Sequence, residues 1–328
     1  MNPAFSVQVP AAVVMIRPRF FASNPDTLQD NAFQSPATAS SADAVAAAAY
    51  AEVTVMARQL ESVGVKVHLF EDEGRATPDS VFPNNWFSTH AGGHVAMYPM
   101  YASSRRKERR RDVIDLLQQA YRVQEVIDYS GLEQDGVYLE GTGAMVLDHA
   151  GRVAYVARSH RADPLALERF CTRFNFEPLV FDAADASGKA VYHTNVLMCV
   201  GTGFAMAGLE LIGDATRRAQ VQARLAEHGR EVIALSAAQI AQFAGNAIEL
   251  QGAEGRILAL SARALRALTP GQIATIERSA GILALEVPTI ELAGGSVRCM
   301  LAGIHLAARA VAPVPAAARL RPAGPLAH

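Results

Sequence analysis

The sequence predicts an α/β fold in which five ββαβ units form a closed ring. Three observations support it: an apolar strand pattern recurs along the chain, a second strand, a helix and a third strand follow it, and the two chain ends complete one unit. The pattern opens at positions 85, 143, 195, 246 and 296, at spacings of 58, 52, 51 and 50 residues. A ring also removes the exposed edge of an open sheet. The alternative is an open α/β sheet with coincidental spacing.

Each unit is predicted to begin with two strands. First strands are expected in "NWFSTH", "GAMVLD", "NVLMCVG", "NAIELQG" and "SVRCMLAG". Second strands are expected in "HVAMYPM", "RVAYVAR", "FAMAGLEL" and "RILALSAR". The glycine-containing segments "AGG" and "HAG" favour hairpin turns between the first two pairs.

A helix and a third strand complete each unit. Helical periodicity is present in "RRDVIDLLQQAY", "LALERFCTRF", "RRAQVQARLAEHG" and "TPGQIATIERSAG", and Pro270 is expected in the first turn of the last of these. Third strands are expected in "VQEVID", "EPLVFD", "EVIALS" and "LALEVPTI".

The fifth unit is divided between the two ends of the chain. Its first strand is "SVRCMLAG", and the N-terminal region supplies the second strand "AVVMIRP", the helix "ADAVAAAAYAEVTVMARQLESVG" and the third strand "VKVHLF". This arrangement predicts one domain over residues 1–328. The polar segment 21–41 is either a lid over the axis or a surface loop.

Composition favours a small-molecule partner. Lys and Arg number 30 against 32 Asp and Glu, and the only dense basic run is 105–111, which argues against nucleic-acid binding. Three cysteines are too few for a disulfide framework, so a cytoplasmic location is expected. No apolar stretch reaches about 18 residues, so no membrane association is expected. Association into a homo-oligomer stays open.

Four residues capable of chemistry lie at or just before the openings of different units. They are Asp79, Glu140, His193 and Cys299, and a ring would bring them together at its axis. A free cysteine is often only a small buried apolar residue, and a nucleophilic thiol needs a lowered pKa or a nearby base. His193 can be that base. Glu140 can orient its imidazole, or serve only as an ion-pair or turn-capping residue.

No cofactor or metal is predicted. The chain has no C-x-x-C or H-E-x-x-H spacing, and "GTGAMV" and "GTGFAMAG" lack the complete G-x-G-x-x-G before a helix.

The motifs "FPNNW", "LEGTG", "HTN" and "RCM" together resemble the guanidine-modifying superfamily, whose fold is the five-bladed α/β propeller, or pentein. Its members include arginine deiminase, dimethylarginine dimethylaminohydrolase, amidinotransferases and succinylarginine dihydrolase. From "MIRPRFF" to "GGSVRCMLAGIHL" the chain is most similar to bacterial citrulline utilisation hydrolases.

The resemblance implies a covalent mechanism. Cys299 would attack the central carbon of a guanidino or ureido group, His193 would move protons, and Glu140 would orient His193. Asp79 would bind the end group of the substrate. Arg106 and Arg161 fall where relatives place arginines that hold the α-carboxylate of the substrate.

One departure from the family pattern concerns the substrate. Many deiminases carry a carboxylate where this chain has Asn84 and Asn85. That carboxylate would pair with a cationic guanidinium. An amide suits the neutral ureido group better, although these asparagines can also be purely structural. We therefore expect hydrolysis of L-citrulline to ornithine, ammonia and carbon dioxide. The alternatives are an arginine or methylarginine hydrolase of the deiminase or dihydrolase type, and a non-catalytic binding module.

Overall fold

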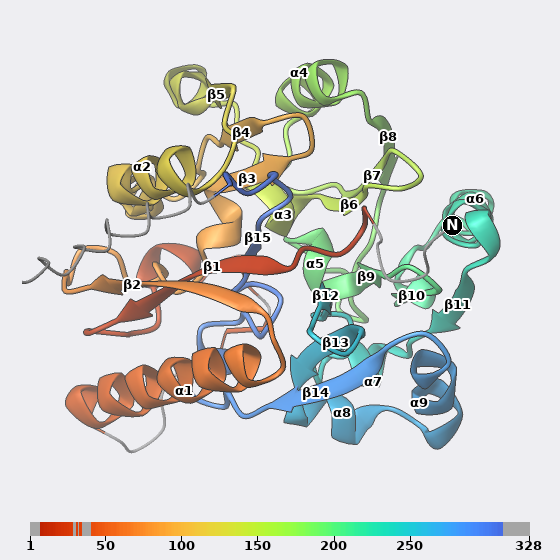
Figure 1. The fold of residues 1–328 in the computed structure, drawn as a ribbon. Helices are drawn as coiled ribbons and strands as arrows, with labels where there is room; N and C mark the ends of the chain where they lie inside the picture. The colour runs from red at the N-terminus through yellow and green to blue at the C-terminus, as the bar shows by residue number, and fades with distance from the viewer. Residues whose placement is uncertain (1–6, 29–30, 32, 35–40, 311–328) are drawn as a thin grey trace, which may run out of the picture.

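In the described part of this α/β protein, the strands form five small mixed sheets (Figure 1). The structure is a computed structural model that describes residues 7–28, 31, 33–34 and 41–310. In each sheet the middle strand pairs antiparallel with one neighbour and parallel with the other. The α/β class and the ββαβ order of the predicted units are therefore confirmed.

The five sheets contain three strands each. In chain order, four of them consist of β3 (Phe87–His90), β4 (His94–Met97) and β5 (Glu125–Asp128); β6 (Val146–Asp148), β7 (Val153–Ala157) and β8 (Glu177–Phe181); β9 (Met198–Val200), β10 (Phe204–Ala207) and β11 (Glu231–Ala234); and β12 (Ile248–Gln251), β13 (Arg256–Ser261) and β14 (Gly281–Leu285).

The fifth sheet joins the two ends of the chain, as the sequence predicts. It consists of β15 (Ala302–Gly303), β1 (Ala12–Pro18) and β2 (Lys66–Asp72). β1 pairs antiparallel with β15, with Val13 opposite Gly303, and parallel with β2, with Ala12 opposite Lys66. The terminal regions thus share one sheet.

A helix connects the second and third strands of each sheet. These helices are α1 (Ala42–Ser62), α2 (Arg111–Ala120), α4 (Pro164–Phe174), α6 (Ala215–Leu225) and α9 (Pro270–Glu277), and Figure 1 shows them at the periphery of the molecule. Shorter helices are α7 (Ala237–Ile240) and α8 (Ala262–Ala267). Among the described residues, none of the helices is both long and apolar enough to cross a bilayer.

Helix starts follow local sequence. Thr269 caps α9 in a capping box with Gln272, and Pro270 occupies the first turn, as expected. Asp163 caps α4 by accepting from the Leu165 N–H.

The first strands begin later than the sequence predicts, because a helical turn precedes several of them. These turns are η2 (Pro83–Asn85), α3 (Gly141–Ala144) and α5 (Thr194–Leu197), and Met300 closes a similar turn onto the Ser296 carbonyl at 3.3 Å. A fully buried apolar run has no alternation that distinguishes a strand from a helical turn. The turns place the side chains of the predicted site.

Candidate active site

A cavity of about 20 Å³ lies between the turns that open the units. It is lined by Thr27, Asn31, Asp79, Phe82, Asn85, Arg105, Arg161, Tyr192, His193, Ala293, Gly295 and Cys299. Five of the sequence-predicted site residues are in this set, although they come from distant parts of the chain. The structure therefore brings a thiol, an imidazole, a carboxyl group and an arginine to one place.

Two side-chain amides hold the sulfur of Cys299. Asn195 Nδ2 lies 3.3 Å and Asn246 Nδ2 3.2 Å from Sγ, and Cys299 is only 2% exposed. N–H donors directed at sulfur favour the thiolate over the neutral thiol. Asn195 and Asn246 stand at equivalent openings of two units, and this recurrence is the sequence signal for their role.

Glu140 lies directly behind His193. Its Oε2 is 2.8 Å from His193 Nε2 and accepts from Arg161 Nη1 at 3.1 Å, and its Oε1 accepts from the Tyr101 N–H at 3.0 Å. Burial alone would raise the pKa of Glu140, but Arg161, His193 and Arg105 together lower it well below the usual value. The carboxylate is therefore ionised and fixes the imidazole.

His193 is set up as a neutral base. Burial lowers its pKa to about 4, although Glu140 opposes this change. Because an ionised carboxylate accepts the Nε2 proton, Nδ1 is left as the proton acceptor. Gly143 gives the ring room, since a Cβ there would lie 2.9 Å from Nδ1.

Arg105 lines the cavity and Arg106 does not. Arg105 is buried, bonds both Glu108 oxygens at 3.0 Å and lies 3.6 Å from Glu140 Oε2. The Arg106 side chain is 32% exposed and donates to the carbonyls of Met100 and Tyr101. Successive side chains of the 3₁₀ turn η3 (Arg105–Glu108) point in different directions, so only one of the two can face inward.

Asn85 and Asn84 occupy different environments. With the Asn85 amide oriented to satisfy both ends, its oxygen accepts from Arg105 Nη1 at 2.7 Å and its nitrogen donates to Asn84 Oδ1 at 3.2 Å. Asn84 is fully buried, and its Nδ2 lies 3.4 Å from Thr142 Oγ1. Of the two predicted asparagines, Asn85 borders the cavity and Asn84 supports it from behind.

Asp79 borders the cavity beside the segment 21–41. It accepts from Asn24 Nδ2 at 2.8 Å and lies 3.7 Å from Arg105 Nε. Burial raises the pKa of Asp79, and Arg105 opposes the rise. Thr27 and Asn31 of the same segment line the cavity, and Asn31 donates to the Ala293 carbonyl at 3.1 Å. The described part of this segment therefore lies over the site; residues 29–30, 32 and 35–40 of it lie outside the described residues.

The other two cysteines do not line the cavity of Cys299. Burial raises the pKa of Cys171 and of Cys199 to about 12, so both are inert thiols. Within the ranges that the structure describes, no group of three or more His, Cys, Asp or Glu side chains is placed to hold a metal ion.

A larger cavity of about 500 Å³ adjoins the small one and shares Arg161 and Tyr192 with it. Lys189 and Arg158 also line it, and its described lining contains no Asp or Glu. The larger cavity is therefore lined by positively charged side chains.

Solved structures share this fold at low sequence identity. A substrate-bound variant of the N-terminal domain of ArgZ, an arginine dihydrolase from the ornithine-ammonia cycle in cyanobacteria, matches with a TM-score of 0.67 and 16% identity over 89% of this chain and 97% of that chain. Unliganded AgrE matches with a TM-score of 0.67 and 17% identity, over 91% of this chain and 40% of the other. A dimethylarginine dimethylaminohydrolase adduct with S-methyl-L-thiocitrulline matches with a TM-score of 0.59 and 14% identity, over 90% and 100%.

Family membership follows from the sequence match. No curated protein sequence matches the chain. The family model for eukaryotic N,N dimethylarginine dimethylhydrolase matches residues 17–306, which is most of the chain. The chain therefore belongs to the N,N dimethylarginine dimethylhydrolase family, within the guanidine-modifying pentein superfamily.

Proposed function

We propose that this protein is a cysteine-dependent hydrolase that cleaves a C–N bond in the ureido group of L-citrulline. The observation that carries the proposal is that Cys299, with two amide donors on its sulfur, borders the same cavity as His193, whose ring is paired with Glu140. Nucleophile, base and orienting carboxylate are the three parts that covalent hydrolysis needs.

In the first step the Cys299 thiolate attacks the ureido carbon, and His193 holds the proton taken from the thiol. The C–N bond to the side chain of the substrate then breaks, and His193 gives its proton to the departing amine. Ornithine leaves, and a carbamoyl group stays on the sulfur. Glu140 stabilises the imidazolium while it carries the proton.

In the second step His193 takes a proton from water, which attacks the carbamoyl carbon. The C–S bond breaks and the thiol is restored, releasing carbamic acid, which decomposes to ammonia and carbon dioxide. One citrulline and one water thus give one ornithine, one ammonia and one carbon dioxide.

Substrate contacts are assigned by chemistry. Asp79 would accept N–H groups of the ureido end, the free N–H of Asn85 would donate to the ureido oxygen, and Arg161 would bind the α-carboxylate. In place of Arg106, Arg105 is the second arginine at the cavity, and it fixes Asn85. A cavity of about 20 Å³ holds roughly one water, so an amino acid requires the walls to separate.

Arginine or a methylarginine is the second candidate substrate. An ionised Asp79, which borders the cavity, would favour a cationic end group. The similar solved proteins include an arginine dihydrolase and a dimethylarginine dimethylaminohydrolase.

We also propose how the five sheets are arranged in the whole molecule. We take the five sheets as blades of one closed propeller forming a single catalytic domain over residues 1–328, in a cytoplasmic protein. The pairing of β15 with β1, which joins the chain ends, supports ring closure.

The deciding experiment incubates purified protein with citrulline, arginine and methylarginines and quantifies ornithine, citrulline and ammonia. Ornithine from citrulline is expected. Citrulline from arginine without ornithine from citrulline would overturn the substrate assignment, and no turnover of any compound would favour a binding module.

The nucleophile is tested separately. Cys299→Ser should lose at least about 1,000-fold in kcat, whereas Cys171→Ala, the matched control, should keep the parental rate. Glu140→Gln should lower kcat about 100-fold or more, because the imidazolium loses its counter-charge. Parental activity in Cys299→Ser would refute the assignment. Mass spectrometry of Cys299 after trapping with citrulline should find an added carbamoyl group.

A further inference from the structure

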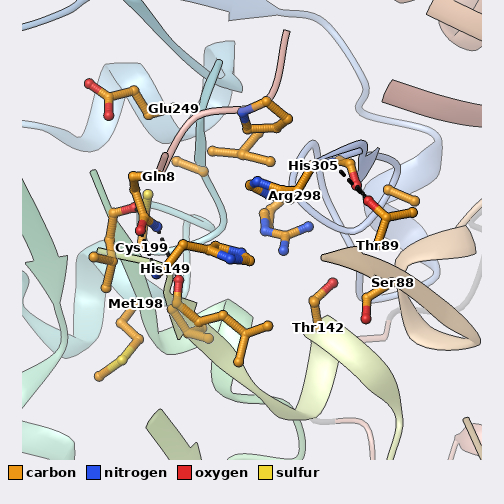
Figure 2. Close-up of a pocket in the computed structure, with 18 of the residues that line it drawn as sticks. Gln8, Ser88, Thr89, Thr142, His149, Met198, Cys199, Glu249, Arg298 and His305 are labelled. Atoms are coloured by element: carbon orange, nitrogen blue, oxygen red, sulfur yellow. Dashed lines mark hydrogen bonds between the residues drawn. The ribbon is translucent and has the colours of Figure 1, made fainter. Parts of the chain in front are cut away.

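A second cavity, of about 60 Å³, surrounds Arg298, the residue before the proposed nucleophile. Figure 2 shows the Arg298 side chain in the middle of this cavity, between His149, His305 and Thr142. Arg298 does not line the cavity of Cys299, so the two sites are separate.

The Arg298 guanidinium has unused hydrogen-bonding capacity. Its Nη1 donates to the Leu301 carbonyl at 3.0 Å, and it forms no ion pair with any carboxylate in the part of the chain that the structure describes. A guanidinium carries five N–H donors in a planar fork. The guanidinium is thus partly buried without a carboxylate partner among the described residues, which is costly for a protein unless something pairs with it.

The single carboxylate in the described lining does not provide that counter-charge. Glu249 accepts from the Thr202 N–H and Oγ1 at 2.6 and 2.7 Å and lies 3.3 Å from Arg256 Nε. In Figure 2 it lies at the edge of the cavity, away from Arg298. Glu249 therefore interacts with Thr202 and Arg256 and not with Arg298.

Two stacked imidazoles lie next to Arg298 and carry no negative charge. The rings of His149 and His305 stack with centroids 3.9 Å apart. Burial, together with the charge of Arg298, lowers the pKa of His305 to about 4, and burial lowers the pKa of His149 as well. Both rings are therefore neutral at neutral pH; the His305 ring hydrogen-bonds the Val7 backbone, and the neutral His149 ring carries one N–H.

A groove of about 750 Å³ adjoins the cavity. The groove and the cavity share Pro10, His149 and His305. Lys66 and Arg152 also line the groove, and its described lining contains no Asp or Glu. A negatively charged solute would therefore be drawn toward the cavity.

We propose that the cavity around Arg298 binds a small planar monoanion of the formate and bicarbonate class. A guanidinium without a carboxylate partner favours one negative charge, its planar fork matches a planar pair of oxygens, and the volume limits the ligand to a few heavy atoms. This site is independent of the substrate assigned to Cys299.

The test is thermal unfolding of the full chain at constant ionic strength, with sodium gluconate replaced stepwise by sodium formate or bicarbonate. Gluconate carries the same charge and is too large for the cavity. The wild type should show a saturable rise in Tm of roughly 2 to 4 °C with the small anions. Arg298→Gln should lose this rise, Arg298→Lys should need a several-fold higher concentration, and the surface control Arg278→Gln should behave as wild type.

A second readout keeps the test decisive if Arg298→Gln does not fold. The imidazole NMR resonances of His149 and His305 in the wild type should shift with formate over the same concentration range as Tm. An equal Tm in gluconate and formate, an undiminished rise in Arg298→Gln, or unchanged imidazole resonances would each overturn the proposal.

Discussion

The side-chain amide of Asn246 connects the backbone at Arg298 to the sulfur of Cys299. Its Oδ1 accepts the Arg298 N–H at 3.0 Å, and its Nδ2 lies 3.2 Å from Sγ and 3.0 Å from the Asn195 carbonyl. One fully buried side chain thus fixes both the turn that presents the thiol and the polar environment of the sulfur.

Removing the amide should make the thiol less reactive. A hydrogen bond to a charged group contributes about 1.5 to 3 kcal/mol, so Asn246→Ala should slow alkylation of Cys299 by iodoacetamide about 10-fold or more at pH 7. Asn195→Ala should act in the same direction, and the half-buried control Gln242→Ala should not. The measurement is the alkylation rate against pH, and an unchanged profile in both Asn variants would show that the amides do not stabilise the thiolate.

The two neighbouring arginines should respond very differently to the same substitution. Arg105→Lys keeps the charge but loses the bidentate contact with Glu108 and the contacts with Asn85, so kcat/KM should fall about 100-fold. Arg106→Lys changes a partly exposed side chain and should cost less than about 5-fold. The measurement is kcat/KM of the two variants by steady-state kinetics. The reverse order of effects would favour the residue that the sequence resemblance indicates.

Gly143 should tolerate no side chain. A Cβ there would lie 2.2 Å from the Asn85 amide and 2.9 Å from His193 Nδ1, and neither group can move without leaving its partners. Gly143→Ala should therefore destabilise the protein by roughly 1 to 3 kcal/mol and lower kcat. Gly131→Ala is the control, because nothing lies within 4 Å of its Cβ. Urea unfolding and kinetics check both effects, and parental values in Gly143→Ala would contradict this packing.

The buried histidines should lower the stability of the protein as the pH drops below about 6.5. Burial lowers the pKa of His193 and of His305 to about 4, and it also lowers the pKa of His90 and His149. Between pH 6.5 and 4 the unfolded chain binds protons that the folded chain does not, so the free energy of unfolding decreases with falling pH.

The size of this effect can be measured one residue at a time. At pH 5 the loss from His305 should be on the order of 2 kcal/mol relative to pH 7.5. His305→Gln should reduce the pH dependence of urea unfolding by about that amount, and the exposed control His160→Gln should leave it unchanged. An identical pH dependence in His305→Gln would show that this imidazole titrates normally.

The repeat in the sequence predicts most of the fold. The regular spacing of the unit openings, the amphipathic helices and the apolar third strands predict the five ββαβ units, and β15 with β1 and β2 confirms that the chain ends share one sheet. The short helical turns before the first strands could not be predicted, because a run buried on all sides gives no periodic signal.

The sequence by itself determined the residue types at each opening: a cysteine, a histidine, two carboxyl groups and a set of asparagines. Only the tertiary structure decided which side chains meet, because the direction of a side chain in a short turn depends on how that turn packs against the others. That is why Arg105 rather than Arg106 lines the cavity, and why Asn195 and Asn246 contact the sulfur of Cys299.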